Sequence, residues 1–131
     1  MMLLADTSAW IDFLRATPSS QERCLRQAIE EREVVVVDPV LLEVLAGARR
    51  NTVDRTQRLL GAQRLEPLAP SLDWLDAATI CRQLRARGVT IRSQIDALIA
   101  AAAIRLDLPV LHRDRDYDEI ARYTSLRVVE A

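Results

Sequence analysis

Four consecutive valines, Val34 to Val37, constrain the fold more than any other stretch of this chain. An unbroken run of β-branched residues is typical of a strand buried on both faces, because a half-exposed strand alternates apolar and polar residues. Such strands occur in parallel sheets that helices cover on both sides. The run therefore predicts a layered α/β domain, with helical segments before and after it.

Strand and helix patterns alternate along the chain, as a parallel sheet requires. Strands are expected at the start of the chain, at 34–37, weakly near 64–68, at 108–112 and at 126–129. Helices are expected at about 8–15, 20–31, 40–50, 53–63, 72–87 and 94–106, and in a short segment that ends at 123. We interpret residues 1–131 as a single three-layer α/β/α domain with a central parallel sheet of about five strands.

Residues with short polar side chains mark where these helices begin. Proline favours the first helical position, so Asp38 is expected to cap the helix that Pro39 opens. The other expected caps are Thr7 or Ser8, Ser20, Ser93 and Asp118.

Composition narrows the class of protein. Half of the 131 residues are apolar and 28% are charged, as in ordinary soluble domains. The longest uncharged apolar run, 97–104, is too short to cross a bilayer, and the start of the chain lacks the pattern of a signal peptide. Cys24 and Cys81 match no metal or redox spacing and are expected to be reduced. We therefore expect a cytoplasmic protein without membrane association.

All eighteen positively charged residues are arginine, and the chain has no lysine. Codon bias in a GC-rich genome is the simpler explanation, but the chemical consequence holds either way. Mechanisms that need a lysine are excluded, including the P-loop, the phospho-aspartate receiver and the haloacid-dehalogenase-like phosphatase. Arginine also suits bidentate contacts with phosphate.

Acidic residues follow two of the expected strands at their carboxyl ends. Asp6 ends the first strand, and Asp114 and Asp116 follow the strand at 108–112. The carboxyl ends of parallel strands lie at one edge of the sheet, where ligands bind in open α/β folds. Most other acids are expected to be solvated on helix faces: Glu22, Glu30, Glu31, Glu33, Asp54, Asp73 and Asp76.

Glu43 and Asp96 are two further acids in apolar surroundings. Glu43 lies inside an apolar helix, where a buried carboxylate needs a partner or a metal, and Gly47 on the same face leaves room for a ligand. The alternative is a surface glutamate with a tolerated glycine near a helix end. Asp96 has capping-box spacing from Ser93, which explains its position without a function. However, the helix it opens is apolar almost all round, so its first turn is expected to be fixed against the sheet.

Several carboxylates at one sheet edge repel one another unless divalent cations hold them together. Oxygen ligands favour Mg²⁺ or Mn²⁺, and a chain with one histidine and no paired cysteines disfavours zinc. Two such cations can activate a water and stabilise the leaving oxygen of a phosphodiester. Without metal, replacing an acid of this cluster by its amide is expected to raise stability.

Four motifs together resemble those of PIN-domain ribonucleases, and most closely those of the VapC toxins of bacterial toxin–antitoxin pairs. They are Asp6-Thr-Ser, Glu43-x-x-x-Gly47, Asp96 at the start of an alanine-rich helix, and His112-Arg-Asp114-Arg-Asp116-Tyr. The resemblance covers the whole chain. It implies a Mg²⁺-dependent endoribonuclease, with Mn²⁺ as a substitute, that cleaves structured RNA such as tRNA or rRNA. It also implies a homodimer and a VapB-like antitoxin whose C-terminal segment blocks the site.

The resemblance also implies roles for individual residues. The catalytic acids would be Asp6, Glu43, Asp96, Asp114 and Asp116. The Mg²⁺ ligands would be Asp6 and Asp96, which are the principal ones, together with Asp114 and Asp116.

His112 departs from the family pattern, because many members have threonine or serine at this position. It would orient a metal ligand or a water, contact phosphate, or make a structural hydrogen bond at the strand end. Candidate phosphate contacts near the acids are Arg92, Arg113 and Arg115, although a solvated surface explains each of them alone. Ser8 is a further candidate contact to the metal shell or the substrate.

Two other functions fit the same residues. A PIN-like module without catalysis would bind RNA or protein as a scaffold, but the presence of all the acids argues against it. A metal-dependent DNA nuclease or phosphatase would use the same pocket, and parallel assays on RNA, DNA and phosphomonoesters would separate these activities.

Overall fold

Four parallel strands form the central sheet of the computed structural model, which describes all residues from 1 to 131. They are β1 (Leu3–Ala5), β2 (Val34–Val37), β3 (Arg64–Glu66) and β4 (Val110–Leu111), in the order β3-β2-β1-β4. Leu4 of β1 pairs with Val35 of β2 on one side and with Val110 of β4 on the other. The carboxyl ends of β1, β2 and β4 therefore emerge next to one another.

The two inner strands form the centre of the hydrophobic core. Every residue of β1 and β2 is buried, which confirms the prediction from the valine run. β3 lies at an edge of the sheet, and both Arg64 and Leu65 are exposed. The burial of whole strands requires cover on both faces, and the helices provide it.

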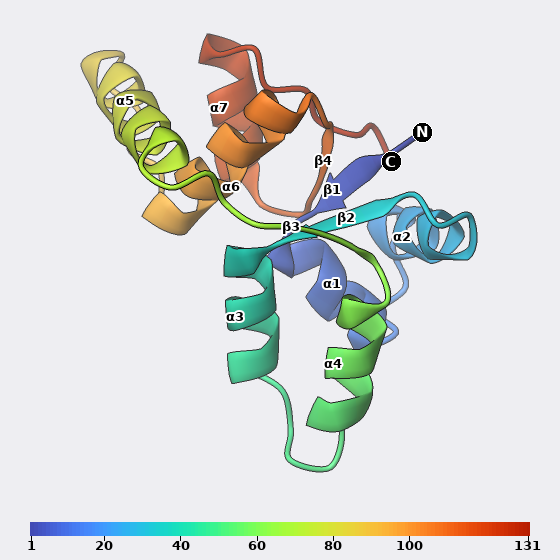
Figure 1. Cartoon of the computed structure of the whole chain (residues 1–131). Helices are drawn as coiled ribbons and strands as arrows, with labels where there is room; N and C mark the ends of the chain where they lie inside the picture. Colours follow the sequence, from blue (N-terminus) through green and yellow to red (C-terminus); the bar gives the residue numbers. More distant parts are fainter.

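Seven helices surround the sheet (Figure 1). They are α1 (Thr7–Leu14), α2 (Ser20–Glu30), α3 (Asp38–Ala46), α4 (Val53–Gly61), α5 (Leu72–Ala86), α6 (Gln94–Leu106) and α7 (Arg115–Tyr123). In the view of Figure 1, α1, α3 and α4 lie below the strands, and α5, α6 and α7 lie above them. The predicted α/β/α arrangement is thus confirmed. None of the helices combines the length and apolar character needed to cross a membrane.

The fifth expected strand, at 126–129, is reduced to a single parallel bridge between Val110 and Val128. The Val110 N–H donates to the carbonyl of Arg127 at 3.0 Å, and the Val129 N–H donates to the carbonyl of Val110 at 2.8 Å. Because β4 has only two residues, it offers the last segment too few partners to form a ladder. The segment still runs along the open edge of β4.

Two helices are capped by acids of the expected cluster rather than by the residues predicted. Asp6 caps α1 in place of Thr7 or Ser8, and its Oδ1 accepts a hydrogen bond from the Ala9 N–H at 3.0 Å. Asp114 caps α7 in place of Asp118, four residues earlier than predicted. Asp6 directly follows β1, and Asp114 follows β4 after His112 and Arg113, so each N-cap carboxylate lies near the strand ends.

Two other caps also differ by one residue from the prediction. Ser19, not Ser20, accepts a hydrogen bond from the Glu22 N–H and caps α2. Asp38 is already helical, and its carboxylate accepts a hydrogen bond from the Leu68 N–H instead of capping α3. Ser93 caps α6 as expected. A periodic pattern locates a helix start to within about four residues here, whereas the cap depends on which side chain reaches a free N–H.

Asp73 is buried in the first turn of α5, so the prediction of a solvated acid is wrong. Its two oxygens accept hydrogen bonds from Nε and Nη2 of Arg105 on α6, each at 2.9 Å, and the Ala69 N–H donates at 2.8 Å. Burial opposes ionisation of Asp73, but these contacts outweigh it and lower the pKa of its carboxyl. Glu22 is likewise buried, and it pairs with Arg26.

We expect Arg105→Gln to lower the free energy of unfolding by about 3 kcal/mol, because Asp73 would stay buried without its countercharge. Chemical denaturation at pH 7 measures this loss. The matched control, Arg127→Gln, breaks an exposed ion pair with Asp107 and is expected to cost less than about 1 kcal/mol. Equal losses in the two variants would show that the buried ion pair contributes no more to stability than the exposed one.

Candidate active site

Asp6 lies at the carboxyl end of β1 and is only 2% exposed. Its Oδ1 accepts hydrogen bonds from the Ala9 N–H at 3.0 Å and from the Ser8 hydroxyl at 2.7 Å. Burial raises the pKa of Asp6 to about 7, with help from the charges of Asp114 and Glu43 and against the effect of these hydrogen bonds. Ionised Asp6 therefore destabilises the fold until a positive charge compensates for it.

Three further carboxylates meet beyond the end of β4. One oxygen atom from each of Asp96, Asp114 and Asp116 lies within 4.8 Å of the others. Asp96 belongs to the first turn of α6, and the other two belong to the start of α7. Because Asp114 also raises the pKa of Asp6, this group and the end of β1 form one acidic cluster.

Asp96 has an unusual pair of oxygen atoms. Its Oδ1 accepts a hydrogen bond from the buried hydroxyl of Tyr117 at 3.2 Å, whereas its Oδ2 is buried without any partner. Burial, together with the neighbouring Asp116 and Asp114, raises the pKa of Asp96 to about 8. An unpartnered carboxylate oxygen among other carboxylates is the donor set that a hard cation such as Mg²⁺ or Mn²⁺ prefers. The residues present therefore fit a divalent cation.

The capping-box explanation of Asp96 does not hold. The Ser93 N–H donates to Oδ2 of Asp116 at 3.3 Å, and the Arg92 N–H donates to the same atom at 2.9 Å. The carboxylate of Asp116 thus occupies the position that a capping-box acid would take. Asp96 is left facing the acidic cluster.

Asp114 differs electrostatically from Asp6 and Asp96. Its Oδ1 accepts hydrogen bonds from the Asp116 N–H at 2.9 Å and from the Arg92 guanidinium at 3.0 Å. Burial opposes ionisation, but these donors outweigh it and lower the pKa of Asp114. The expectation that every acid of the cluster destabilises the metal-free protein is therefore wrong for Asp114, whose charged form the fold favours.

Glu43 is half-buried on α3, and its Oε1 accepts a hydrogen bond from the Thr7 hydroxyl at 2.6 Å. Thr7 follows Asp6 directly, so this bond joins α3 to the end of β1. Gly47 ends α3, where an added Cβ would lie 3.5 Å from the Glu43 carbonyl oxygen, an ordinary contact. The space beside Glu43 therefore does not require a glycine at position 47.

The loop between β4 and α7 is held by Ser8 and His112. The Ser8 hydroxyl, which donates to Asp6, accepts a hydrogen bond from the Arg113 N–H at 2.9 Å. Nδ1 of His112 accepts the Asp114 N–H at 3.1 Å, and its Nε2 lies 3.4 Å from Oδ1 of Asp118. Burial lowers the pKa of His112 despite the nearby acids. Of the roles considered for His112, the contacts match a neutral ring that orients Asp114.

The three arginines expected to contact phosphate have different surroundings. Arg92 pairs with Asp114 at 3.0 Å, and Arg113 pairs through Nη1 with Asp12 at 2.8 Å. Arg115 is exposed and forms no ion pair. Only Arg115 is thus free to meet a phosphate without first leaving a carboxylate.

Sequence reasoning missed two side chains that position the acids, Thr7 and Tyr117. The sequence predicts Thr7 only as a cap, although its place between Asp6 and Ser8 indicates that it lies at the same strand end. Tyr117 directly follows Asp116 in a quoted motif, but its bond to Asp96 depends on the packing of α6 on α7.

The PIN domain family model matches residues 3–123. This chain belongs to the PIN domain family. Its curated relatives include Ribonuclease VapC11 of Mycobacterium tuberculosis (strain ATCC 25618 / H37Rv) and VapC ribonuclease Mb1587 of Mycobacterium bovis. Each is 39% identical over 129 residues, which cover 96% of this chain and 96% of the relative.

Solved structures of complexes that contain VapC-type chains have the same fold. The VapBC complex of Salmonella typhimurium bound to DNA matches with a TM-score of 0.77 at 15% identity, over 98% of this chain and 97% of that one. VapBC2 of Rickettsia felis, bound to a promoter DNA fragment, matches with a TM-score of 0.74 at 17% identity, over 98% of both chains. At these identities the likeness concerns the fold alone.

We expect Asp96→Asn to stabilise the metal-free protein at high pH. The folded-state pKa of about 8 exceeds the unfolded value of about 3.9, so the folded state binds the extra proton between them. The parent therefore loses stability as the pH rises through this window, and the amide avoids that loss. The free energy of unfolding of variant and parent is measured in EDTA at pH 5 and at pH 8. From pH 5 to pH 8, the difference between the two proteins should shift in favour of the variant by at least about 1 kcal/mol.

Two variants serve as controls for this measurement. Asp114→Asn is expected to lose stability at pH 7, because the lowered pKa of Asp114 stabilises the fold above the unfolded pKa. Asp76→Asn, on the exposed face of α5, should follow the parent at both pH values. An Asp96→Asn variant that gains no stability on the parent at pH 8 would contradict the raised pKa of Asp96.

Proposed function

We propose that this chain is a metal-dependent endoribonuclease and the toxin of a toxin–antitoxin pair, with residues 1–131 as a single nuclease domain. The observation that carries the proposal is the buried, unpartnered Oδ2 of Asp96 beside Asp114 and Asp116. It occurs in a chain that is 39% identical to named ribonucleases over almost its whole length. A PIN-like scaffold without catalysis would have no need for such a costly group.

The proposed metal ligands are the acids at the adjoining strand and helix ends: Asp6, Asp96, Asp114 and Asp116. A bound Mg²⁺, or Mn²⁺ in its place, would lower the pKa of a water and offset the charge that develops on the phosphodiester. Asp6 and Asp96, whose pKa values are raised, would release protons as they become ligands, so metal affinity should rise with pH. Asp114, whose charged form the fold favours, would already carry a negative charge before the metal binds.

Glu43 and Ser8 would act beside the ligands. Thr7 occupies Oε1 of Glu43, which leaves Oε2 to accept a proton from the attacking water. The Ser8 hydroxyl both donates to Asp6 and accepts from Arg113, so it orients an acid and is not placed to act as a covalent nucleophile. This arrangement supports direct hydrolysis by water.

The finer parts of the proposal come from the family. The proposed substrate is structured RNA such as tRNA or rRNA, and the proposed place of action is the cytoplasm. The proposed partners are a second copy of the chain and a VapB-like antitoxin. Solved relatives that share the fold are toxin–antitoxin complexes, among them VapBC-1 of nontypeable Haemophilus influenzae, which supports an antitoxin partner.

We expect Asp6→Asn and Asp96→Asn to lower the rate of Mg²⁺-dependent RNA cleavage at least about a hundredfold, since even outer-shell changes at metal sites cost about 10–100-fold. Gel assays with the purified chain and its variants measure this loss. Asp76→Asn is the matched control and should cleave as the parent does.

Cleavage that persists undiminished in EDTA would contradict a metal-dependent mechanism. DNA and phosphomonoesters tested in parallel separate an RNA nuclease from the two alternatives that use the same pocket. Metal binding by calorimetry without cleavage of any substrate would instead favour the scaffold.

A further inference from the structure

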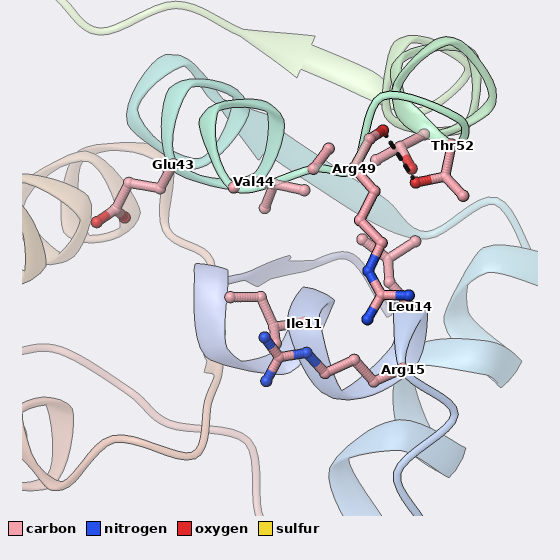
Figure 2. Close-up of a pocket in the computed structure, with 10 residues that line it drawn as sticks. Ile11, Leu14, Arg15, Glu43, Val44, Arg49 and Thr52 are labelled. Carbon is pink, nitrogen blue, oxygen red and sulfur yellow. Dashed lines mark hydrogen bonds between the residues drawn. The ribbon is translucent and has the colours of Figure 1, made fainter.

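A groove of about 420 Å³ lies between α1, α3 and α4 (Figure 2). Ile11, Leu14 and Val44 give it an apolar floor. Glu43 lines one end of the groove and also bonds to Thr7 at the acidic cluster. The groove therefore adjoins the candidate active site through Glu43.

Arg15 and Arg49 line the groove away from Glu43. Figure 2 shows their guanidinium groups extending over it, one from the end of α1 and the other from the loop after α3. Both side chains are exposed, and neither forms an ion pair. Two unpaired positive charges that face one groove repel each other, and an anion between them would relieve that repulsion.

The chain that follows Arg49 extends this positive charge. Residues 49–58 contain four arginines and a single acid, Asp54. All four arginines are exposed and without ion pairs: Arg49, Arg50, Arg55 and Arg58. A row of unpaired arginines favours a ligand that carries a negative charge at every repeat over a peptide with one carboxylate.

We infer that Arg15 and Arg49 bind a backbone phosphate of the RNA strand away from the scissile phosphate. This inference rests on the proposed function. α1 has eight residues and is about 12 Å long, with Thr7 at the acidic cluster and Arg15 directly after its far end. A strand whose scissile phosphate lies at the acids thus presents another phosphate over the groove. The planar guanidinium fork matches phosphate oxygens in pairs.

The test measures RNA binding by the full-length Asp6→Asn protein, which is catalytically silenced. The probe is a short fluorescein-labelled single-stranded RNA, followed by anisotropy over a range of salt concentrations. Arg15→Gln with Arg49→Gln should weaken binding about tenfold and reduce the slope of log K against log salt by about 0.7, the value for one phosphate contact on a single strand. Arg15→Lys with Arg49→Lys keeps both charges and should retain the slope.

The matched control removes two exposed arginines elsewhere, Arg122→Gln with Arg127→Gln. These lie on α7 and in the segment after it, at the opposite end of the molecule from α4 in Figure 1. The change in net charge is the same, so a specific site predicts a much smaller effect. In the active protein, the Arg15 and Arg49 changes should raise KM for RNA and leave kcat unchanged.

The outcomes separate this inference from the proposed function. If the wild-type protein cleaves RNA, and Arg15→Gln with Arg49→Gln binds RNA as tightly as the control Arg122→Gln with Arg127→Gln, the phosphate site is wrong and the nuclease stands. If binding falls as expected but the wild-type protein does not cleave, the phosphate site stands and the nuclease is wrong. If binding does not fall and the wild-type protein does not cleave, both the phosphate site and the nuclease are wrong. A fluorescein-labelled glutamate-rich peptide serves as a second probe. If Arg15→Gln with Arg49→Gln still binds RNA as the parent does but loses this peptide, the groove is a protein-docking site and the inference is overturned.

Discussion

The pairing of β1 between β2 and β4 is the constraint on which the rest of this structure depends. Because all three strands run in the same direction, the chain leaves each of them at the same edge of the sheet. Asp6 leaves from β1, α3 with Glu43 follows β2, and Asp114 follows β4. The buried strands bring these acids together although more than a hundred residues of sequence separate the first from the last.

The assembled acids fall into two electrostatic kinds. Asp114 accepts hydrogen bonds from the Asp116 N–H and the Arg92 guanidinium, and these outweigh burial and lower its pKa. Asp6 and Asp96 are dominated by burial, which raises their pKa values to about 7 and about 8. The first kind provides a fixed framework, and the second provides groups whose charge state responds to what binds. A site of this composition can stay folded without a cation and still favour one.

Sequence patterns predicted the layers, the parallel sheet and the acidic edge because these depend on local periodicity and strand direction. The valine run and the alanine-rich helix behind Asp96 are visible without any tertiary information. The ion pair of Asp73 was not predictable in the same way, because Arg105 lies 32 residues away on another helix. For the same reason the partner of Arg113, which is Asp12 on α1, could not be read from the acidic motif that surrounds it. Helix caps were predicted to within one residue except at α7, where Asp114 takes the place of Asp118, because choosing among neighbouring polar residues requires the actual reach of each side chain.

The hydroxyl of Ser8 has a consequence for which amino acids this position can accept. One oxygen atom both donates a hydrogen bond to Asp6 and accepts one from the main-chain N–H of Arg113, which lies 105 residues further along. Alanine offers neither function, and a carboxylate or an ammonium offers only one of them. A serine or threonine hydroxyl combines the two on one oxygen atom, whereas a cysteine thiol does so only weakly. The chemistry of a single atom thus restricts this position as tightly as burial restricts the valines of β2.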